Sequence, residues 1–350
     1  MVHSVRKWLL PFSALYGGIV TIRNFGYDNN IFSTKKLPVP VVSVGNISVG
    51  GSGKTPFVLY LIERLLSMGK KPAVLSLGYK RLTGERRVSC PNAGEEVDVQ
   101  LLGDEPALIS RSYPNVPVAV HKNRHASGLV LLDKFDIDVF VLDDGLQNRE
   151  LNRDLDFVLM NHALDDLYDS YLPAGNVRDR KGRIRQADVI VLTGHSQFTV
   201  DATVLSEVHS CANAPVAGIS FTPSSLVNSL GEDCDLMLLQ GSNVAAFCGI
   251  ARSDGFFVAL EELGYSISRR KVFGDHHWFD EYDLDEIFQG DEETLAVTTM
   301  KDAIRIFGDE ELVERDDVKR IYGLRERATV NFGEEHINAA LLNLFERAYA

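Results

Sequence analysis

Residues 41–56 decide the fold of this chain and read VVSVGNISVGGSGKTP. The apolar, β-branched run that opens the stretch predicts a buried strand, and the glycine-rich turn after it ends in Gly-Lys-Thr. Apolar residues then recur four apart at Phe57, Leu61 and Leu65, which predicts a helix that Gly69 closes. A strand, a glycine loop, a Lys-Thr pair and a helix, in this order, are the parts of a phosphate-binding loop.

The residue types of this loop suit the triphosphate of a nucleotide. Glycines let backbone N–H groups turn toward phosphate oxygens, and the helix N-terminus adds a partial positive charge. Lys54 is expected to reach the β- and γ-phosphates, and the Thr55 hydroxyl is expected to bind Mg²⁺. The sequence therefore predicts ATP and Mg²⁺ as cofactors, with the nucleotide bound by Gly50, Gly51, Ser52, Gly53, Lys54 and Thr55.

One position departs from the common loop pattern G-x-x-x-x-G-K-[ST], because Ser48 stands where the first glycine is expected. An alternative is therefore an ordinary glycine-rich turn before a helix. A second motif favours the nucleotide site, because residues 139–144 read VFVLDD. An apolar strand that ends in Asp is the usual Mg²⁺-binding partner of a phosphate loop, so Asp143 and Asp144 are candidate metal ligands. The alternative for Asp143 is a simple turn at the end of a strand.

Length and composition narrow the class of protein. A chain of 350 residues suggests about two domains, and a hydrophobic share of 45% is enough for a sizeable core. The net charge of −13 disfavours nucleic acid as a partner. The four cysteines are scattered without a C-x-x-C pair, which fits a reducing cytoplasm and gives no metal-binding signature.

The N-terminus carries an uncharged run, residues 8–22, between basic residues. The run is shorter than the roughly 20 residues that a membrane-spanning helix needs, and no A-x-A cleavage site of a signal peptide follows it. Trp8, Phe12 and Tyr16 recur every fourth residue, so we expect a helix that lies at a lipid headgroup boundary. The alternative is a helix packed on its own domain.

Strand and helix patterns alternate through the rest of the chain. This alternation predicts a doubly wound, mainly parallel α/β sheet of the phosphate-loop kinase kind, with a second, smaller α/β domain after it. The predicted regions are a membrane-interface helix at 1–30, an ATP-binding domain at 31–221, a linker at 222–242, a second α/β domain at 243–325 and a C-terminal helix at 326–350 that can return to the first domain.

Several polar motifs follow predicted strands, at the sheet edge where α/β proteins bind ligands. The basic turn at 78–81 follows one strand, and a cationic cluster at 178–185 is a candidate site for an anionic substrate or a lipid headgroup, or else a solvated face. Asp104 and Glu105 stand at a predicted helix start, where a plain cap is the alternative.

Asp275-His276-His277 also ends a predicted strand, and it admits a metal, a proton-transfer or a structural role. A metal pair is disfavoured because adjacent histidines do not share a face.

Motifs spread along the chain together resemble those of one family. They are Gly45-Asn46 with 50–56, Gly103 to Pro106, Asp143 to Gly145, Leu172 to Gly175, Phe247 to Arg252, Asp275 to His277 and Lys301 to Ala303. The set is similar to that of the tetraacyldisaccharide 4′-kinases, the lipid A 4′-kinases of Gram-negative bacteria, and the resemblance covers nearly the whole chain. A Gly-Asn turn before a shifted phosphate loop is typical of that family, which accounts for Ser48.

The resemblance implies ATP-dependent phosphorylation of the 4′-hydroxyl of tetraacyldisaccharide 1-phosphate to lipid IVA, a late step of lipid A biosynthesis. It implies a peripheral protein on the cytoplasmic face of the inner membrane, with a lipid A precursor as substrate. Asp104 is then the expected base, assisted by His276 after domain closure, with Lys54 as the third catalytic residue. The implied Mg²⁺ ligands are Thr55, Glu105, Asp143 and Asp144. The implied acceptor-binding residues are Tyr79, Arg81, Arg124, Gln147 and Arg178.

Two departures from the family concern the expected acceptor side. Lys80 stands in a motif that is usually Arg-Gly-Tyr-Gly-Arg, and Asn148 stands where the family usually has His. Other classes of phosphate-loop protein fit less well. A GTPase or metallochaperone needs an Asn-Lys-x-Asp guanine reader, but residues 192–196 read LTGHS. A membrane-positioning ATPase needs a second lysine early in the loop, where this chain has Gly50-Gly51.

Overall fold

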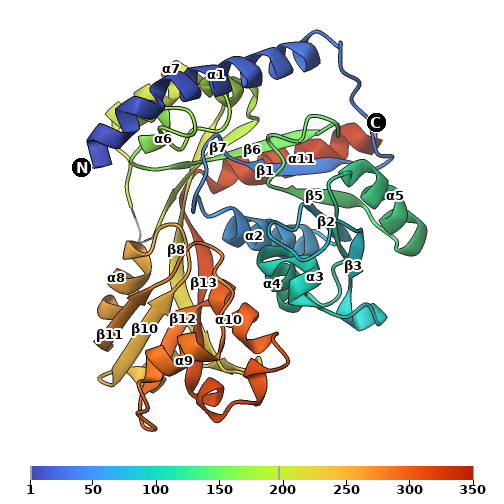
Figure 1. The fold of residues 1–350 in the computed structure, drawn as a ribbon. Helices are drawn as coiled ribbons and strands as arrows, with labels where there is room; N and C mark the ends of the chain where they lie inside the picture. Colours follow the sequence, from blue (N-terminus) through green and yellow to red (C-terminus); the bar gives the residue numbers. More distant parts are fainter. Residues whose placement is uncertain (1, 196–197, 350) are drawn as a thin grey trace. The chain divides into compact units, whose positions relative to one another are not determined.

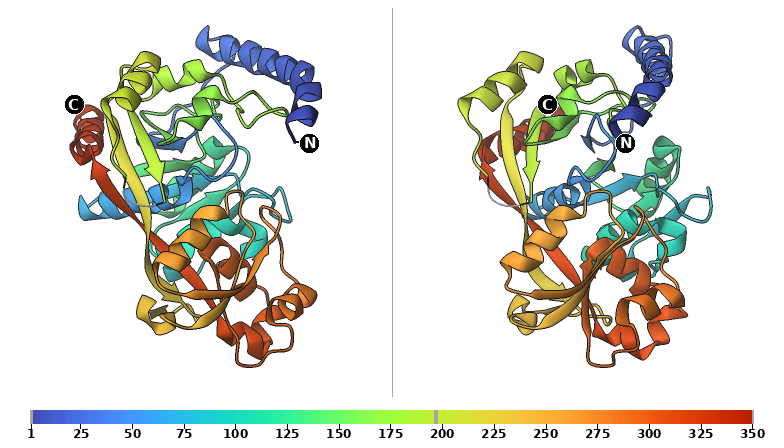
Figure 2. Two further views of the ribbon diagram at one scale, coloured as in Figure 1. Left: turned by 90° about the vertical axis from the view of Figure 1, so that its left-hand side faces the viewer. Right: turned by 60° about the vertical axis from the view of Figure 1, so that its left-hand side comes forward.

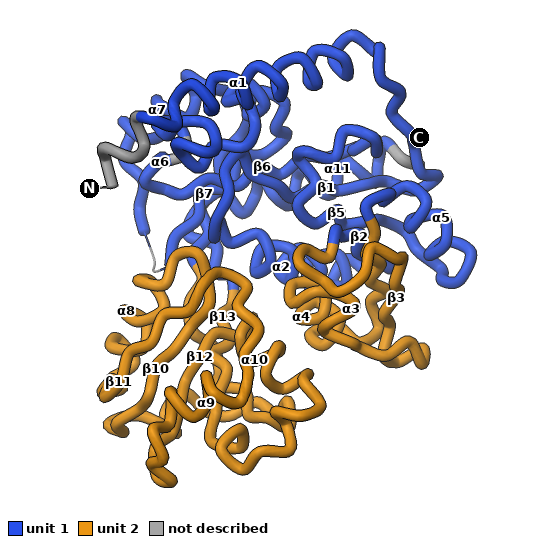
Figure 3. Tube along the Cα trace, viewed as in Figure 1, with its two compact units in different colours: residues 1–77, 122–220, 328–350 blue, residues 78–121, 221–327 orange. Residues whose placement is uncertain are grey.

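The computed structural model describes residues 2–195 and 198–349, drawn in Figure 1. The chain divides into two compact units, coloured in Figure 3. Unit 1 contains residues 1–77, 122–220 and 328–350, and unit 2 contains residues 78–121 and 221–327. Ser196, the last residue of the stretch 192–196 compared with a guanine-binding motif, lies outside the described residues. The side chains of Arg6 and Lys7 also lie outside them.

Unit 1 is built on a parallel sheet whose strands follow the order β2-β5-β1-β6-β7-β8. The strands are apolar and buried on both faces, which is the pattern that parallel sheets require. Their bounds are β1 Val41–Gly45, β2 Pro72–Ser76, β5 Val139–Asp143, β6 Leu155–Asn161, β7 Val189–Gly194 and β8 Val216–Val227, of which β8 runs on into unit 2.

Helices cover this sheet. The predicted apolar face of α2 is confirmed, because Phe57, Leu61 and Leu65 are fully buried. The C-terminal helix α11 packs on β6 and β7, and Figure 2 shows α1 and α11 on opposite sides of unit 1. The helical segments of the unit are α1 Val2–Asp28, α2 Lys54–Ser67, α5 Arg124–Lys134, α6 Asp165–Tyr168, η2 Lys181–Gln186, α7 Ala202–Cys211 and α11 Glu334–Tyr349.

The main strands of unit 2 are parallel and follow the order β11-β10-β12-β13. Their bounds are β10 Asn243–Cys248, β11 Ser266–Val272, β12 Leu295–Thr299 and β13 Ile321–Phe332, whose last residues belong to unit 1. Short antiparallel pairs are formed by β3 Arg87–Ser89 with β4 Val118–Val120, and by β9 Asp233–Cys234 with the end of β8. The helical segments are η1 Pro91–Ala93, α3 Val99–Leu102, α4 Asp104–Ser112, η3 Leu236–Leu239, α8 Asp254–Glu262, α9 Glu281–Phe288, α10 Met300–Phe307, η4 Leu312–Glu314 and η5 Asp316–Arg320.

The predicted fold class is confirmed, since both units alternate helices with parallel strands. Two details differ from the expected organisation. Residues 222–242, expected as a linker, hold the end of β8, β9 and η3. Residues 78–121 pack with unit 2, because Val99, Leu102 and Ala107 share an apolar cluster with Ile304 of α10.

Helix α1 extends over 27 residues and contains Pro11. Within the described part of the chain, no helix combines the length and the apolar character that crossing a membrane demands.

Candidate functional site

The phosphate-binding loop connects β1 to α2, at the carboxyl edge of the unit 1 sheet. Gly50 and Gly53 have φ values of 107° and 73°, a left-handed backbone that favours glycine. Gly53 caps α2, and Lys54 is the first helical residue. The backbone N–H groups of the first turn of α2 therefore have no partner within the helix and can bind an anion.

Ser48 takes the place of the first glycine without strain. It is buried and forms an antiparallel backbone bridge with Val177, and the next N–H, that of Val49, donates to the Asn176 carbonyl at 2.8 Å. Its φ is not positive, so a glycine is not required there. The altered loop pattern thus reflects a loop start that pairs with the segment before Arg178.

Lys54, Arg178 and Asp144 form an ion cluster beside this loop. Lys54 Nζ lies 3.7 Å from Asp144 Oδ1 and donates to Asn46 Oδ1 at 3.3 Å. Arg178 donates to both carboxylate oxygens of Asp144, with Nη1 at 2.8 Å from Oδ2, and its Nη2 also donates to Asn46 Oδ1 at 2.5 Å. One amide oxygen therefore orients both cations toward the loop.

Asp144 is held as a carboxylate by these cations. Burial on its own would raise its pKa, but the charges of Lys54 and Arg178 outweigh burial and hold the pKa well below the ordinary value of 3.8. Gly45, at the end of the neighbouring strand β1, leaves room for the segment that follows Asp144. A Cβ at Gly45 would lie 2.5 Å from Cβ of Leu146, so a side chain would push the segment after Asp144 away.

Asp143 and Thr55 offer oxygen atoms that suit Mg²⁺. Asp143 ends β5 opposite Val44, and its Oδ2 accepts a hydrogen bond from Ser76 Oγ at 2.9 Å. Thr55 Oγ1 is buried without a hydrogen-bond partner among the described residues, which fits a hydroxyl that binds a cation. The described residues hold no group of three or more His, Cys, Asp or Glu that could bind a metal by itself. A magnesium ion here would share its ligands with nucleotide phosphates, as Mg²⁺ commonly does.

Asp104 and His276 meet within unit 2. Asp104 is the first residue of α4, and its Oδ2 lies 2.8 Å from His276 Nδ1, at hydrogen-bond distance. The N–H of Glu105 donates to Asp104 Oδ1 at 2.8 Å, and the N–H of His276 donates to the Gly249 carbonyl at 3.1 Å. Both residues lie in the same compact unit. The contact is therefore already formed in this structure, and the expected domain closure stays a prediction.

Basic residues around Asp104 keep it ionised. Arg305 Nη2 lies 3.1 Å from Asp104 Oδ2. Burial alone would raise the pKa of Asp104, but the hydrogen bond from His276 and the charges of Lys301 and Arg305 lower it to about 2. The stabilisation that these contacts give is fully present above the ordinary pKa of 3.8 and is lost as the pH falls toward 2.

Arg305 connects this carboxylate to a second buried one. Its Nη1 lies 3.2 Å from Asp302 Oδ1 and donates to the His277 carbonyl, and the side chain is almost fully buried. Asp302 Oδ2 in turn accepts from the Gly249 N–H at 3.0 Å and from Thr299 Oγ1 at 2.6 Å. The polar contacts of Arg305 and Asp302, both on α10, therefore fix Asp104 and the loop that carries His276.

Replacing Arg305 by methionine should lower the free energy of unfolding by about 3–5 kcal/mol, because two buried carboxylates lose their shared cation. Urea denaturation at neutral pH measures the change. The matched control is Lys319→Met, which breaks an exposed ion pair with Asp316 and should leave the unfolding midpoint unchanged. A loss below about 1 kcal/mol for Arg305→Met would contradict the assignment.

The remaining predicted residues fall into both units. In unit 2, Glu105 pairs with Lys301, and the half-exposed Tyr79 ring packs edge-on against His276 with 5.2 Å between ring centres. Arg81 Nη1 donates to the carbonyls of Glu85 and Leu101. The metal role of Glu105 and the acceptor roles of Tyr79 and Arg81 stay predictions.

In unit 1, Arg124 begins α5, and burial lowers its pKa despite the nearby charges of Asp144 and Asp143. Gln147 Nε2 donates to the Asn46 carbonyl at 2.9 Å, so this side chain supports the phosphate loop. The acceptor roles predicted for Arg124, Gln147 and Arg178 also stay predictions.

Sequence reasoning missed two residues that organise these clusters. Asn46 enters the sequence pattern only as part of a family motif, and nothing in its spacing indicates that it bonds both Lys54 and Arg178. Arg305 could have been found from its i, i+3 spacing to Asp302 on an amphipathic helix, which places the two on one face.

The sequence and the fold of this chain are similar to those of known proteins of one family. A sequence profile described as tetraacyldisaccharide-1-P 4′-kinase matches residues 5–346. A tetraacyldisaccharide 4′-kinase of Aquifex aeolicus is 38% identical over 309 residues, covering 87% of this chain and 91% of that protein. One from Chlorobium limicola is 33% identical over 350 residues, covering 98% and 99% of the two chains. The crystal structure of LpxK from Aquifex aeolicus in complex with ATP superposes with a TM-score of 0.79 at 34% identity, over 97% of this chain and 99% of that one.

Proposed function

We propose that this chain, which belongs to the tetraacyldisaccharide-1-P 4′-kinase family, transfers the γ-phosphoryl group of ATP to the 4′-hydroxyl of tetraacyldisaccharide 1-phosphate. The family catalyses the ATP-dependent 4′-phosphorylation step of lipid A synthesis. The observation that carries the proposal is the phosphate loop with Lys54 at the start of α2, in a chain that matches the family from residue 5 to 346. The product is the 1,4′-bisphosphorylated lipid IVA.

The donor is bound by unit 1. The N–H groups of the first turn of α2 and the ammonium of Lys54 stabilise the negative charge of the phosphates. Arg178 and Asn46 hold Asp144 and Lys54 in a fixed arrangement before the nucleotide binds. Thr55 and Asp143 would hold Mg²⁺, which would supply positive charge to neutralise the phosphates.

The acceptor is oriented by Asp104. Its carboxylate accepts a hydrogen bond from the 4′-hydroxyl and takes the proton as the P–O bond forms, while His276 fixes its direction through Oδ2. A pKa of about 2 makes Asp104 a weak base. A weak base is sufficient here, because the loose transition state of phosphoryl transfer leaves the hydroxyl proton in place until late in the reaction. Orientation of the hydroxyl is therefore the larger part of its role.

The assay that tests this function is direct. The protein is incubated with ATP, Mg²⁺ and tetraacyldisaccharide 1-phosphate in detergent micelles, and the product is identified by mass spectrometry. One added phosphate on the sugar that lacks it, dependent on ATP and absent with GTP alone, is the expected result. Nucleotide hydrolysis without lipid phosphorylation would favour a switch-type phosphate-loop protein.

Helix α1 provides the contact with the lipid surface. Its large apolar side chains face solvent, with exposed fractions of 81% for Trp8 and 73% for Ile22, and the face comprises Trp8, Phe12, Leu15, Ile19, Ile22 and Phe25. An apolar helical face without cover, on an enzyme whose substrate is a lipid, fits insertion at the headgroup boundary. We assign this face to the cytoplasmic leaflet of the inner membrane, where the precursor and ATP are both present.

Substituting Phe12 by glutamate should weaken binding to anionic phospholipid vesicles by about tenfold, because an apolar anchor is replaced by a charge that lipid repels. Vesicle flotation measures the bound fraction. Leu230→Glu is the matched control, because it makes the same charge change at an exposed leucine of unit 2 and should leave flotation unchanged. Equal flotation of the Phe12 variant and the wild type would assign α1 to the protein core instead. A point substitution is preferable to deleting residues 1–23, since deletion also removes the buried contacts of α1.

A further inference from the structure

Helix α1 has a second face that is buried and polar. Ser13, Val20 and Asn24 are buried along one side of the helix, and Asn24 has no exposed surface. Gly17 lies on the same side, where a Cβ would come within 2.9 Å of the Tyr171 ring. Tyr16, expected at the lipid boundary with Trp8 and Phe12, is only partly exposed and turns its hydroxyl inward. A helix that served only as an anchor would need small apolar residues here, because burying an amide costs free energy unless it is hydrogen-bonded.

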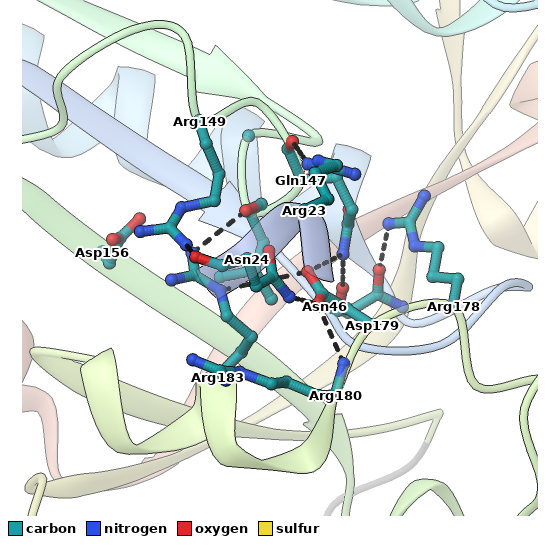
Figure 4. Close-up of polar contacts among 12 residues, drawn as sticks. Arg23, Asn24, Asn46, Gln147, Arg149, Asp156, Arg178, Asp179, Arg180 and Arg183 are labelled. Atoms are coloured by element: carbon teal, nitrogen blue, oxygen red, sulfur yellow. Dashed lines mark hydrogen bonds and ion pairs between the residues drawn. The ribbon is translucent and has the colours of Figure 1, made fainter. Parts of the chain in front are cut away.

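The polar face of α1 bonds to two consecutive residues, Arg178 and Asp179. Tyr16 Oη donates to the Arg178 carbonyl at 3.0 Å, and Asn24 Nδ2 donates to Asp179 Oδ1 at 2.7 Å. Arg149 Nη1 donates to the Asn24 carbonyl at 2.9 Å and completes the junction, and Figure 4 shows the side chains of Asn24, Arg149 and Asp179. Asn24 and Asp179 are both buried, so their bond is protected from competing water.

The same two residues hold the phosphate loop. The N–H groups of Arg178 and Asp179 both donate to the Ile47 carbonyl, at 2.8 and 3.1 Å. Gln147 Nε2 lies between Asp179 Oδ2, at 3.4 Å, and the Asn46 carbonyl, at 2.9 Å (Figure 4). The Arg178 guanidinium reaches Asn46 and Asp144. Arg178 and Asp179 therefore connect α1 to the cluster that orients Lys54, and Arg23 of α1 also donates directly to the Gln147 carbonyl.

We propose that α1 is a positioning element of the nucleotide site, with Asn24 and Tyr16 as positioning residues for phosphoryl transfer. They fix Arg178 and Asp179, which in turn fix Asn46, Ile47 and Gln147 beside the phosphate loop. The inference rests on the proposed function for its kinetic readout. It adds that the helix with the lipid-facing surface also sets the geometry of the nucleotide site. Since Arg178 and Asp179 contact both α1 and the phosphate loop, loosening α1 loosens the orientation of Lys54.

The test separates positioning from anchoring. In detergent micelles at saturating acceptor, loss of an anchor alone leaves kcat unchanged. Asn24→Ala should lower kcat by about tenfold, with less than a threefold change in the KM for the acceptor. Amide hydrogen exchange of residues 45–53 should become about tenfold faster.

The matched control is Asn338→Ala, which removes a hydrogen bond from Arg64 elsewhere in unit 1 and should leave kcat and exchange unchanged. If Asn24→Ala does not fold, Tyr16→Phe decides, since it removes one oxygen and should lower kcat about threefold. A folded Asn24 variant with wild-type kcat and exchange overturns the proposal. If the wild type does not phosphorylate the lipid, the proposed function fails, while faster exchange of 45–53 in the variant still supports positioning.

Discussion

Lys54→Ala should reduce phosphoryl transfer to the tetraacyl acceptor by about a thousandfold, the range expected when one preorganised donor to a developing negative charge is lost. Two effects add. The ammonium that reaches the β- and γ-phosphates is gone, and Asp144 loses one of the two cations that hold its pKa low. The freed Asp144 carboxylate then repels the nucleotide. Initial rates at saturating ATP and acceptor measure the loss.

The control for this substitution is Lys71→Ala. Lys71 directly precedes β2, at the amino edge of the same sheet, and its ion pair with Asp136 is exposed. It carries the same charge in the same unit but lies at the edge opposite the phosphate loop, so its replacement should leave the rate unchanged. Undiminished transfer by Lys54→Ala would remove the basis for the nucleotide site in residues 50–55.

Asp104→Asn should lower kcat by between about 10²- and 10⁴-fold, the range that general-base groups contribute. The asparagine retains the size of the side chain and its bond to the Glu105 N–H, but it can no longer take the hydroxyl proton. ATP affinity, measured by calorimetry, should stay within about twofold, because the residues assigned to the nucleotide belong to unit 1. His276→Ala should show a smaller loss of the same kind.

The pH dependence offers a second readout of Asp104. With a pKa of about 2, the carboxylate is ionised throughout the physiological range. The kcat profile of the wild type should therefore show no acid limb from Asp104 between about pH 5 and 8. A variant that loses nucleotide affinity and rate equally would point to a metal role for Asp104 in place of proton transfer.

Local signals in the sequence are enough for the fold class and for the donor side of the site. The β-branched strand at 41–45, the glycines at 50 and 53 and the apolar spacing of α2 are all short-range features. Each depends on backbone preferences within a few residues, and the carboxyl ends of parallel strands meet at one edge by geometry alone. These local features are therefore sufficient to place Asp143 near the loop.

Domain membership and residue pairing cannot be deduced in the same way. Residues 78–121 follow the second strand of unit 1, yet they pack with unit 2 because the apolar faces of α4 and α10 match. Pairing of Asp104 with His276 and Arg305 depends on this packing, and it joins residues about 170 to 200 positions apart. Spacing carries no information about contacts at that separation, so on the sequence side only the family resemblance indicates the partner of Asp104.

The sequence by itself determined that the chain binds a nucleotide phosphate on a parallel α/β sheet and that its motifs are those of a lipid 4′-kinase family. Only the tertiary structure shows which residues of those motifs contact and orient one another. It showed that Asn46 orients Lys54 and Arg178, that His276, Lys301 and Arg305 together keep Asp104 ionised, and that the polar side of α1 is bonded to the segment beside the phosphate loop. The physical reason is that hydrogen bonds and charge pairs act over about 3–4 Å in space, whatever the distance along the chain.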